Sequence, residues 1–291
     1  MSYKTPDQIA VAASAAGLKK ASTPLPNMLV GGFLAGAYIA FGGLVAIEVT
    51  AGMDREQWGG LVTLASGSVF SLGLILVIIA GADLLTGNMG LVPLAVLHRR
   101  VGISRMLLNF AVVLVGNLLG ALFVAYFLAV QTGVIGSAGA EDGTAAAATY
   151  ARLEGIATGK ALDETHGQVF LRAIGCNWLV CLAVWSAIAA DDIAGKILAI
   201  FFPIMAFVAL GFDHVVANMF FLPAAYFAGV PDLTWGAILT NWLFAGLGNF
   251  VGGAVFVGGA YWFLYLRGAP SGHEAGATSD ASGTSGAPRT R

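Results

Sequence analysis

Charged residues are scarce in this chain of 291 residues: Asp, Glu, Lys and Arg make up 10% of it, against 58% hydrophobic residues. A soluble globular domain carries roughly 25% charged residues, so the composition excludes that class and favours a polytopic membrane protein. The mean hydropathy of +0.83 agrees with this interpretation. The formal net charge of −2 gives no sign of a nucleic-acid partner.

Cysteine is also rare, with Cys176 and Cys181 as the two copies. They lie on one predicted helix and point to different faces, because successive residues are about 100° apart around a helix. The pair therefore predicts neither a disulfide nor a metal site, and we expect two small buried side chains. No cofactor motif occurs in the sequence, so no cofactor is expected.

Long apolar runs predict six membrane segments, and each has the ~20 residues that a hydrocarbon core demands. They cover residues 28–50, 61–97, 104–130, 169–190, 193–230 and 235–267. The second and the fifth segments are too long for a single span, and polar residues interrupt both of them. We expect each of these two to be a pair of half-helices.

The two interrupted segments contain copies of one stretch: residues 81–93 read GADLLTGNMGLVP and residues 211–223 read GFDHVVANMFFLP. The matched pairs are Gly81 and Gly211, Asp83 and Asp213, Asn88 and Asn218, Met89 and Met219, and Pro93 and Pro223. Later stretches match Asn109 with Asn241 and Asn117 with Asn249. Three spans per half is an odd number, so the second half must enter the membrane from the opposite side. The sequence thus predicts an all-α membrane protein built from an inverted repeat.

Basic residues in the short loops set the expected orientation. With six spans they fall on one side, which carries Lys19, Lys20, His98, Arg99, Arg100, Arg105, Lys196 and Arg267. Both termini are therefore predicted to be cytoplasmic, in a multi-pass protein of the cell (inner) membrane.

Residues 1–24 lack the continuous apolar core of a signal peptide. Thr5, Pro6 and Gln8 form the pattern of a capping box with a first-turn proline. We expect a short amphipathic helix on the cytoplasmic face of the membrane, ending near Gly17 and the two lysines that follow it.

The rest of the chain divides into a six-span domain over 25–267 and a tail over 268–291. The tail consists mainly of Gly, Ser, Ala and Thr without apolar periodicity, and we expect it to be disordered. Within the six-span domain, the first repeat covers 25–130, the outer connection 131–167 and the second repeat 168–267.

Broken helices at membrane depth point to a transport path, because irregular backbone survives there only when it is buried in protein or lines a wet cavity. The N–H groups at the start of each following half-helix carry partial positive charge. Two such starts that face each other suit an anion better than a cation. Histidine, with a reference pKa of ~6.5, donates a proton or a hydrogen bond near neutral pH. We therefore expect a small weak-acid anion to pass, with His214 as the donor.

Other polar residues near the breaks have structural interpretations as well. Asp83 and Asp213 precede the half-helix starts, where capping or holding the loop is favoured over contact with a solute. Thr86 either caps a half-helix or offers its hydroxyl to a solute, and the sequence leaves both open. The amides that either tie backbone and helices together or line the path are those of Asn88, Asn218, Asn177 and Asn249.

Three stretches resemble the signatures of the formate/nitrite transporter family: GADLLTGN from Gly81, AIGCNWLVCLA from Ala173 and GFDHVVANM from Gly211. GNFVGG from Gly248 fits the family's last helix, and the resemblance extends to about Arg267. It implies a homopentamer of six-span, aquaporin-like protomers in the lipid bilayer. Each protomer is then expected to have its own pore for formate, nitrite, hydrosulfide or a related small anion.

The resemblance also implies roles for single residues. His214 matches the family's central histidine, Thr86 its loop threonine and Lys160 its vestibule lysine, although the sequence alone reads Lys160 as a solvated charge. Asn177 and Asn249 match polar positions that help to hold the central site. The implied apolar constrictions consist of Leu74, Leu84 and Leu85 on one side and Val180 and Phe207 on the other, with Phe70 nearby.

Two departures from the family pattern leave the choice of anion open: Leu85 stands where many members have an aromatic residue, and Asp213 where glutamate is common. We expect a channel or proton-coupled facilitator for formate, with nitrite or hydrosulfide as alternatives. An aquaporin-like pore for neutral solutes is disfavoured because Met89 and Met219 follow the repeated asparagines and because His214 lies beside a break. A membrane enzyme with His214 and Asp213 as an acid–base pair is disfavoured too, since no nucleophile or metal cluster supports it.

Overall fold

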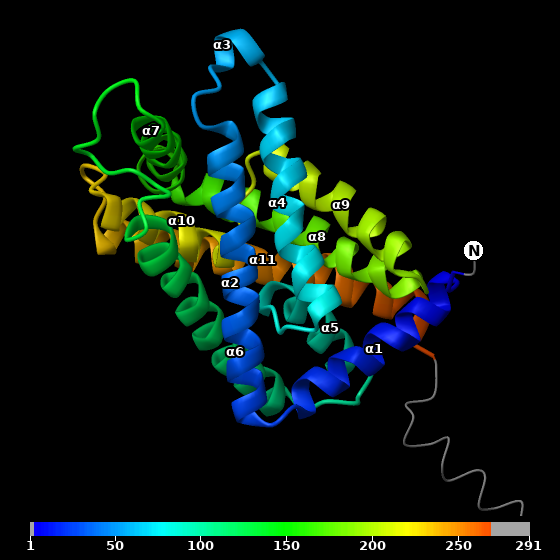
Figure 1. Cartoon of the computed structure of the whole chain (residues 1–291). Helices are drawn as coiled ribbons and strands as arrows, with labels where there is room; N and C mark the ends of the chain where they lie inside the picture. Colours follow the sequence, from blue (N-terminus) through cyan, green and yellow to red (C-terminus); the bar gives the residue numbers. More distant parts are fainter. Residues whose placement is uncertain (1–2, 269–291) are drawn as a thin grey trace, which may run out of the picture.

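The computed structural model describes residues 3–268, and every regular element in this range is a helix (Figure 1). The first part of the chain contains α1 (Pro6–Ser22), α2 (Leu25–Thr50), α3 (Arg55–Trp58), α4 (Leu61–Ala80), α5 (Leu85–Leu97), α6 (Ile103–Phe123) and the π-helix η1 (Val124–Val130). The second part contains α7 (Ala145–Thr158), η2 (Gly159–Asp163), α8 (His166–Ala189), α9 (Ile193–Ala209), α10 (Val215–Ala228), α11 (Trp235–Gly253), η3 (Ala254–Gly259) and η4 (Trp262–Leu266). Beyond Gly268, the predicted tail lies outside the described residues.

Five helices are long and apolar enough to cross a membrane, namely α2, α4, α6 with η1, α8, and α11 with its π-helical continuation. Three shorter apolar helices, α5, α9 and α10, accompany them. Residues 81–84 separate α4 from α5, and residues 210–214 separate α9 from α10. We call these segments the first break and the second break. Both interruptions that the sequence predicted are therefore present.

Glycines allow the long helices to pack with their backbones nearly in contact. Where α2 meets α6, a Cβ at Gly36 would lie 2.0 Å from the carbonyl oxygen of Asn117, and one at Gly120 would lie 1.9 Å from that of Phe33. Where α8 meets α11, a Cβ at Gly248 would lie 2.3 Å from a carbonyl oxygen of α8. These distances are far below van der Waals contact, so alanine at these positions would force the helices apart.

The helix α1 lies across one end of the molecule, where it packs on α5 (Figure 1). The predicted capping box at its start is present, with Gln8 bonded back to Thr5. The helix continues past Gly17 to Ser22 because Gly17 is a point of close packing: a Cβ there would lie 2.1 Å from the Leu91 carbonyl oxygen. We call this end of the molecule the α1 end.

The opposite end, which we call the α7 end, carries α3 and α7 (Figure 1). The sequence analysis treated this part of the chain as a connection and did not predict α7. The helix forms because the alanine-rich segment favours it and because the Thr144 hydroxyl accepts a hydrogen bond from the Ala147 N–H at 3.2 Å. Leu153 of α7 is fully buried. The connection is therefore a packed part of the protein rather than a solvated loop.

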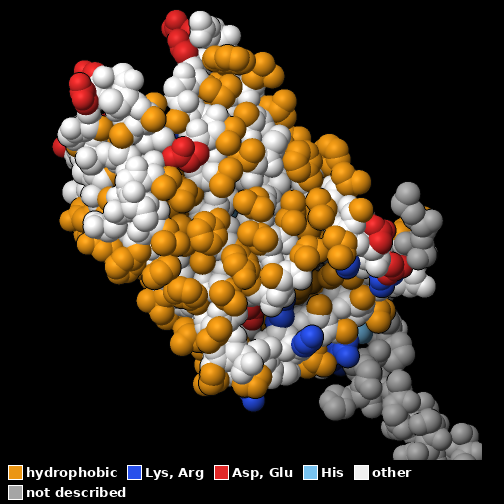
Figure 2. All heavy atoms as spheres, in the orientation of Figure 1, with side chains coloured by type: hydrophobic (Ala, Val, Ile, Leu, Met, Phe, Trp, Pro, Cys, Tyr) orange, Lys and Arg blue, Asp and Glu red, His pale blue; other side chains and the backbone are white. Residues whose placement is uncertain are grey.

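Apolar side chains cover most of the face drawn in Figure 2, and the Lys and Arg side chains visible there gather toward the α1 end. Large exposed residues of this kind include Leu171, Leu198 and Phe263. A soluble monomer rarely exposes so much contiguous apolar surface. In a membrane protein such a surface contacts lipid or another protein.

Candidate functional site

A left-handed glycine ends α4 and opens the first break. Gly81 has a φ of +82°, and the N–H groups of Gly81 and Ala82 both donate to the Val77 carbonyl, at 3.1 and 2.9 Å. This bonding satisfies the end of the helix and turns the chain aside. The Asp83 N–H then donates to the Gly31 carbonyl of α2 at 3.0 Å. As a result, α5 begins in the interior of the protein.

The second break also begins with a left-handed glycine. Gly211 has a φ of +71°, and the Phe212 N–H donates to the Phe207 carbonyl at 3.0 Å. His214 is the N-cap residue of α10, and its Nδ1 accepts a hydrogen bond from the Ala217 N–H at 3.0 Å. An imidazole thus takes the place of the Ser, Thr, Asp or Asn side chain that usually caps a helix.

One asparagine fixes the start of each half-helix. Asn117 accepts from the Leu85 N–H at 2.9 Å and donates to the Asp83 and Gly32 carbonyls, at 2.9 and 2.8 Å. Asn249 makes the matching bonds with the Val215 N–H and with the Asp213 and Ala173 carbonyls, each at 2.8 Å. Both amide groups are fully buried and both of their N–H bonds are in use. The structure therefore places Asn249 as a support for the second break.

Each break also carries a carboxylate that binds a lysine and an asparagine. The matching contacts are Lys20 to Asp83 at 2.8 Å, Asn88 to Asp83 at 2.8 Å, Lys160 to Asp213 at 2.8 Å and Asn218 to Asp213 at 3.0 Å. Asn88 and Asn218 donate in turn to the side chains of Asn109 and Asn241. Asp83 and Asp213 hold their loops in this way, and neither of them caps the following helix. Lys160 is an ion-pair partner of a buried carboxylate rather than a freely solvated charge.

The two breaks meet at one polar contact in the centre of the protein. The Thr86 hydroxyl lies 2.8 Å from His214 Nε2, and both side chains are buried, with exposed fractions of 0% and 2%. Asn177 holds this contact from α8, because its amide donates to the Thr86 carbonyl at 3.1 Å and to the Asn249 carbonyl at 2.7 Å. The backbone carbonyl of Thr86 is thus fixed, and its hydroxyl faces the histidine.

The hydrogen bonds around His214 assign its ring proton. Nδ1 accepts the Ala217 N–H and therefore carries no proton itself. A neutral ring then holds its proton on Nε2, which donates to the Thr86 hydroxyl oxygen. That assignment leaves the hydroxyl hydrogen of Thr86 available to a solute. The centre can therefore offer a buried hydrogen-bond donor to an anion without a fixed charge.

Apolar side chains surround the centre at a small cavity of about 10 Å³, which we call the apolar cavity. This volume holds about one water molecule. Its lining consists of His214 with Ile39, Phe70, Leu74, Leu84, Val180, Ile204 and Phe207. Five of the residues that the sequence resemblance assigned to constrictions thus line a single cavity. Leu85 is buried but does not line it, and Ile39 and Ile204 were not predicted.

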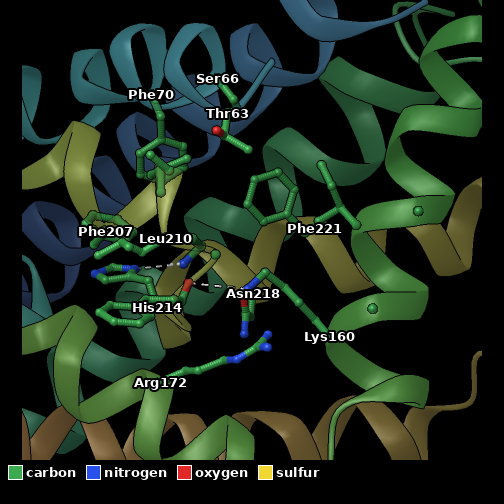
Figure 3. Close-up of a pocket in the computed structure, with 18 of the residues that line it drawn as sticks. Thr63, Ser66, Phe70, Lys160, Arg172, Phe207, Leu210, His214, Asn218 and Phe221 are labelled. Atoms are coloured by element: carbon green, nitrogen blue, oxygen red, sulfur yellow. Dashed lines mark hydrogen bonds between the residues drawn. The ribbon is translucent and has the colours of Figure 1, made fainter. Parts of the chain in front are cut away.

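A larger cavity of about 480 Å³, the wide cavity, lies at the α7 end next to the apolar cavity (Figure 3). His214 lines both of them. The ring of Phe70 lies between the two, with centroids 5.8 Å from Phe207 and 6.4 Å from Phe221. The basic side chains that line the wide cavity are Arg55, Arg152, Lys160 and Arg172. Glu164 also lines it, but basic side chains outnumber acidic ones, so the wide cavity favours anions.

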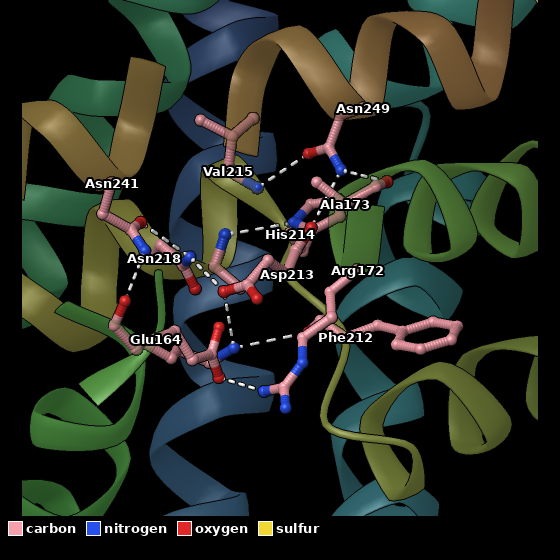
Figure 4. Close-up of polar contacts among 12 residues, drawn as sticks. Glu164, Arg172, Ala173, Phe212, Asp213, His214, Val215, Asn218, Asn241 and Asn249 are labelled. Atoms are coloured by element: carbon pink, nitrogen blue, oxygen red, sulfur yellow. Dashed lines mark hydrogen bonds and ion pairs between the residues drawn. The ribbon is translucent and has the colours of Figure 1, made fainter. Parts of the chain in front are cut away.

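Several residues of this region were missed by the sequence analysis. Glu164 and Arg172 line the wide cavity and bind each other (Figure 4). They lie in or beside a segment whose charges are mixed in sign, which gave no reason to single out one pair. Phe221 was missed because an aromatic residue on an apolar helix has no pattern that separates lining from core. Within residues 3–268, no group of three or more His, Cys, Asp or Glu side chains is placed to hold a metal ion.

The sequence of this chain matches known transporters. Residues 7–263 match the family model described as formate/nitrite transporter. An uncharacterized transporter of Bacillus subtilis, YrhG, is 51% identical over 92% of this chain and 96% of its own length. A probable formate transporter of Methanothermobacter thermautotrophicus is 50% identical, with coverages of 91% and 98%. The formate channel BtFdhC of Bacillus thuringiensis is 44% identical, with coverages of 92% and 98%.

Solved structures are similar as well. A structure described as an FNT family ion channel superposes with a TM-score of 0.78 at 29% identity, covering 88% of this chain and 98% of that one. A structure described as a pentameric formate channel with formate bound gives a TM-score of 0.70 at 30% identity, with coverages of 83% and 98%. Sequence and fold therefore point to the same group of proteins.

Proposed function

This chain belongs to the formate/nitrite transporter family, and from that premise we propose that it is a channel or proton-coupled facilitator for formate. The proteins it matches are transporters and channels rather than enzymes. Formate appears in the names of two relatives and in the description of a similar structure. A small monovalent anion is therefore the solute class, and formate is the member of it that we propose.

The observation that carries the proposal is the buried contact between Thr86 and His214, whose ring lines both the wide cavity and the apolar cavity. An anion in the wide cavity is attracted by lysine and arginine side chains. It then loses its water at the apolar cavity, where a bare charge would be very costly. At this point the hydroxyl of Thr86, bonded to His214, donates a hydrogen bond or passes on a proton. The N–H groups at the starts of α5 and α10 add partial positive charge.

We further propose the membrane arrangement in which this path crosses the bilayer. The broken segments α4–α5 and α9–α10 each count as one span, which gives six spans in two inverted halves with both termini in the cytoplasm. The α1 end then faces the cytoplasm and the α7 end faces outward. The cytoplasmic helix takes residues 1–24 and the channel domain residues 25–267. The exposed apolar faces contact lipid and neighbouring subunits of a homopentamer, by analogy with the pentameric structure that the chain resembles.

Flux measurements on proteoliposomes test the proposal. Formate, nitrite, hydrosulfide and glycerol are each supplied to vesicles with the purified protein, over a series of external pH values. We expect formate to pass fastest, with a rate that rises as the pH falls, and glycerol to pass no faster than through empty vesicles. Faster nitrite or hydrosulfide would assign the chain to another anion of the same class. Glycerol flux that does not change with pH would instead indicate a pore for neutral solutes.

A further inference from the structure

Lys160, Glu164 and Arg172 line the wide cavity, and Asp213 is buried next to Lys160. The proposed function uses these four charged side chains only in part. Lys160 of η2 binds Asp213 of the second break, and Arg172 of α8 binds Glu164 of the connection. The carboxylates are well shielded, with exposed side-chain fractions of 0% for Asp213 and 11% for Glu164. Two acidic groups thus lie close together away from bulk water.

Each carboxylate has one oxygen with donors and one without. Glu164 Oε1 accepts from Arg172, and Asp213 Oδ1 accepts from Lys160 and Asn218. The other two oxygens, Glu164 Oε2 and Asp213 Oδ2, are buried and have no donor. Figure 4 shows the carboxyl group of Glu164 turned toward that of Asp213. Two ionised carboxylates offer only acceptors and repel each other, so this arrangement favours a proton between them.

We propose that Glu164 and Asp213 share one proton, and that its loss or gain switches the charge of the wide cavity. With the proton present, two cations and one carboxylate charge remain in the group, so it carries a net positive charge. Without the proton, the charges of the group cancel. The switch makes the cavity attract anions more strongly when the external solution is acidic. The effect on anions rests on the proposed function, whereas the sharing of a proton by Glu164 and Asp213 does not.

The proton resides on Glu164, because Asp213 has better partners for its ionised form. Lys160 and Asn218 both donate to Asp213, which favours the carboxylate. Burial and the neighbouring charge of Asp213 raise the pKa of Glu164 to about 7, against the opposing effects of Lys160 and Arg172.

Other charged or titratable groups face the same cavity from the remaining elements. Arg55 comes from α3, Arg152 from α7 and His214 from the second break. The two arginines keep a constant positive charge in the range of interest, and the ring of His214 is neutral with its Nδ1 bonded to the backbone. The group that titrates near neutral pH in this cavity is therefore Glu164.

The variant Glu164→Gln tests the switch, because glutamine keeps the shape and resembles the protonated acid. The initial rate of formate uptake is measured for wild type and variant at external pH values from about 6 to about 8. Protonation of formate itself affects both proteins alike, so it cancels in the ratio of the two rates. We expect equal rates at about pH 6 and a wild-type rate about 3- to 10-fold below that of the variant at about pH 8, as a single charge near the path would give.

Asp163→Asn is the matched control, since Asp163 is an exposed carboxylate one position away. The ratio of its uptake rate to that of wild type should not change with pH. A constant ratio for Glu164→Gln as well would overturn the proposal. Absence of formate uptake by wild type at every pH would overturn the proposed function, and the shared proton is then decided by a measurement that needs no transport.

That measurement is an infrared pH titration of the wild-type protein in lipid. We expect the band of a protonated carboxyl group to appear as the pH falls, with a midpoint near pH 7, and to be missing in Glu164→Gln but retained in Asp163→Asn. If wild type has no such band, or if the band persists in Glu164→Gln, the shared proton is excluded.

Discussion

The first and second breaks share the residues that form the turn and differ in the residues at the centre of the protein. In both, a left-handed glycine ends a helix, an asparagine holds the next helix start, and an aspartate binds a lysine and a second asparagine. The two breaks differ at the positions that contribute to the proposed path. Leu84 of the first break corresponds to His214 of the second, and Thr86 corresponds to Val216. The comparison teaches that the shared residues build the turn, while the unshared ones supply the chemistry.

The largest effect should come from removing the asparagines that hold the helix starts. Asn117→Ala and Asn249→Ala each leave one N–H and two carbonyls without their partner in the interior. At about 1–2 kcal/mol for each group, the free energy of unfolding should fall by about 3–6 kcal/mol in both variants. Unfolding in detergent micelles measures this, with Asn27→Ala, an exposed asparagine of α2, as the control. A large effect in one variant and none in the other would show that the breaks are built differently.

The lysines should matter to different degrees, because their partners differ in exposure. Lys160→Met leaves Asp213 buried and unpaired, which should destabilise the protein by about 3–5 kcal/mol. Lys20→Met should cost less, since the Asp83 side chain retains an exposed fraction of 11%. Adding Asp213→Asn to Lys160→Met should restore much of the lost stability. Equal losses in the two single variants, or no rescue, would contradict the account.

Replacing His214 by leucine, the residue at the corresponding position of the first break, should separate the effect on stability from the effect on flux. His214→Leu removes the ring that bonds Thr86 and caps α10, so two buried groups lose their partner, which costs about 2–4 kcal/mol of stability. Formate flux, however, should fall about 100-fold or more, the lower range for loss of a positioned proton donor. His166→Leu, which changes an exposed histidine at the start of α8, should leave the flux unchanged. Unimpaired flux in His214→Leu would remove His214 from the path.

The smallest effect concerns stability and pH at the second break. Burial and Asp213 raise the pKa of Glu164 from 4.5 to about 7, so the folded protein binds a proton that the unfolded chain releases above about pH 4.5. The stabilising effect of this proton is fully present below about pH 4.5 and is lost as the pH rises through about 7. The Tm should therefore decrease between about pH 5 and pH 8, and less so in Glu164→Gln. The same slope in both proteins would contradict this.

The residues that form the two turns could be predicted from the sequence because they occur in both halves. The shifts that align Asp83 with Asp213 and Asn117 with Asn249 identified the residues that make matching bonds. The length of the apolar runs also indicated both interruptions, because a run longer than one span predicts a break within it.

The contacts at the centre and in the wide cavity could not be predicted in the same way. Thr86 and His214 are 128 positions apart and belong to different halves, so no local pattern pairs them. The family resemblance gave each a role, but their contact came from the structure. Glu164 was missed because its partner Arg172 belongs to a different element and because the charges of the connection are mixed in sign. Its low exposure depends on tertiary packing, which a local pattern does not show.

A double-mutant cycle for formate flux tests the central claim most directly, namely that the two breaks act together at one contact. The proteins compared are wild type, Thr86→Val, His214→Leu and the double variant, all in proteoliposomes at one pH. If Thr86 and His214 work as a unit, each single change lowers the flux and the double variant is no slower than the slower single one. If the two reductions multiply, the residues act independently and the account of the centre is contradicted.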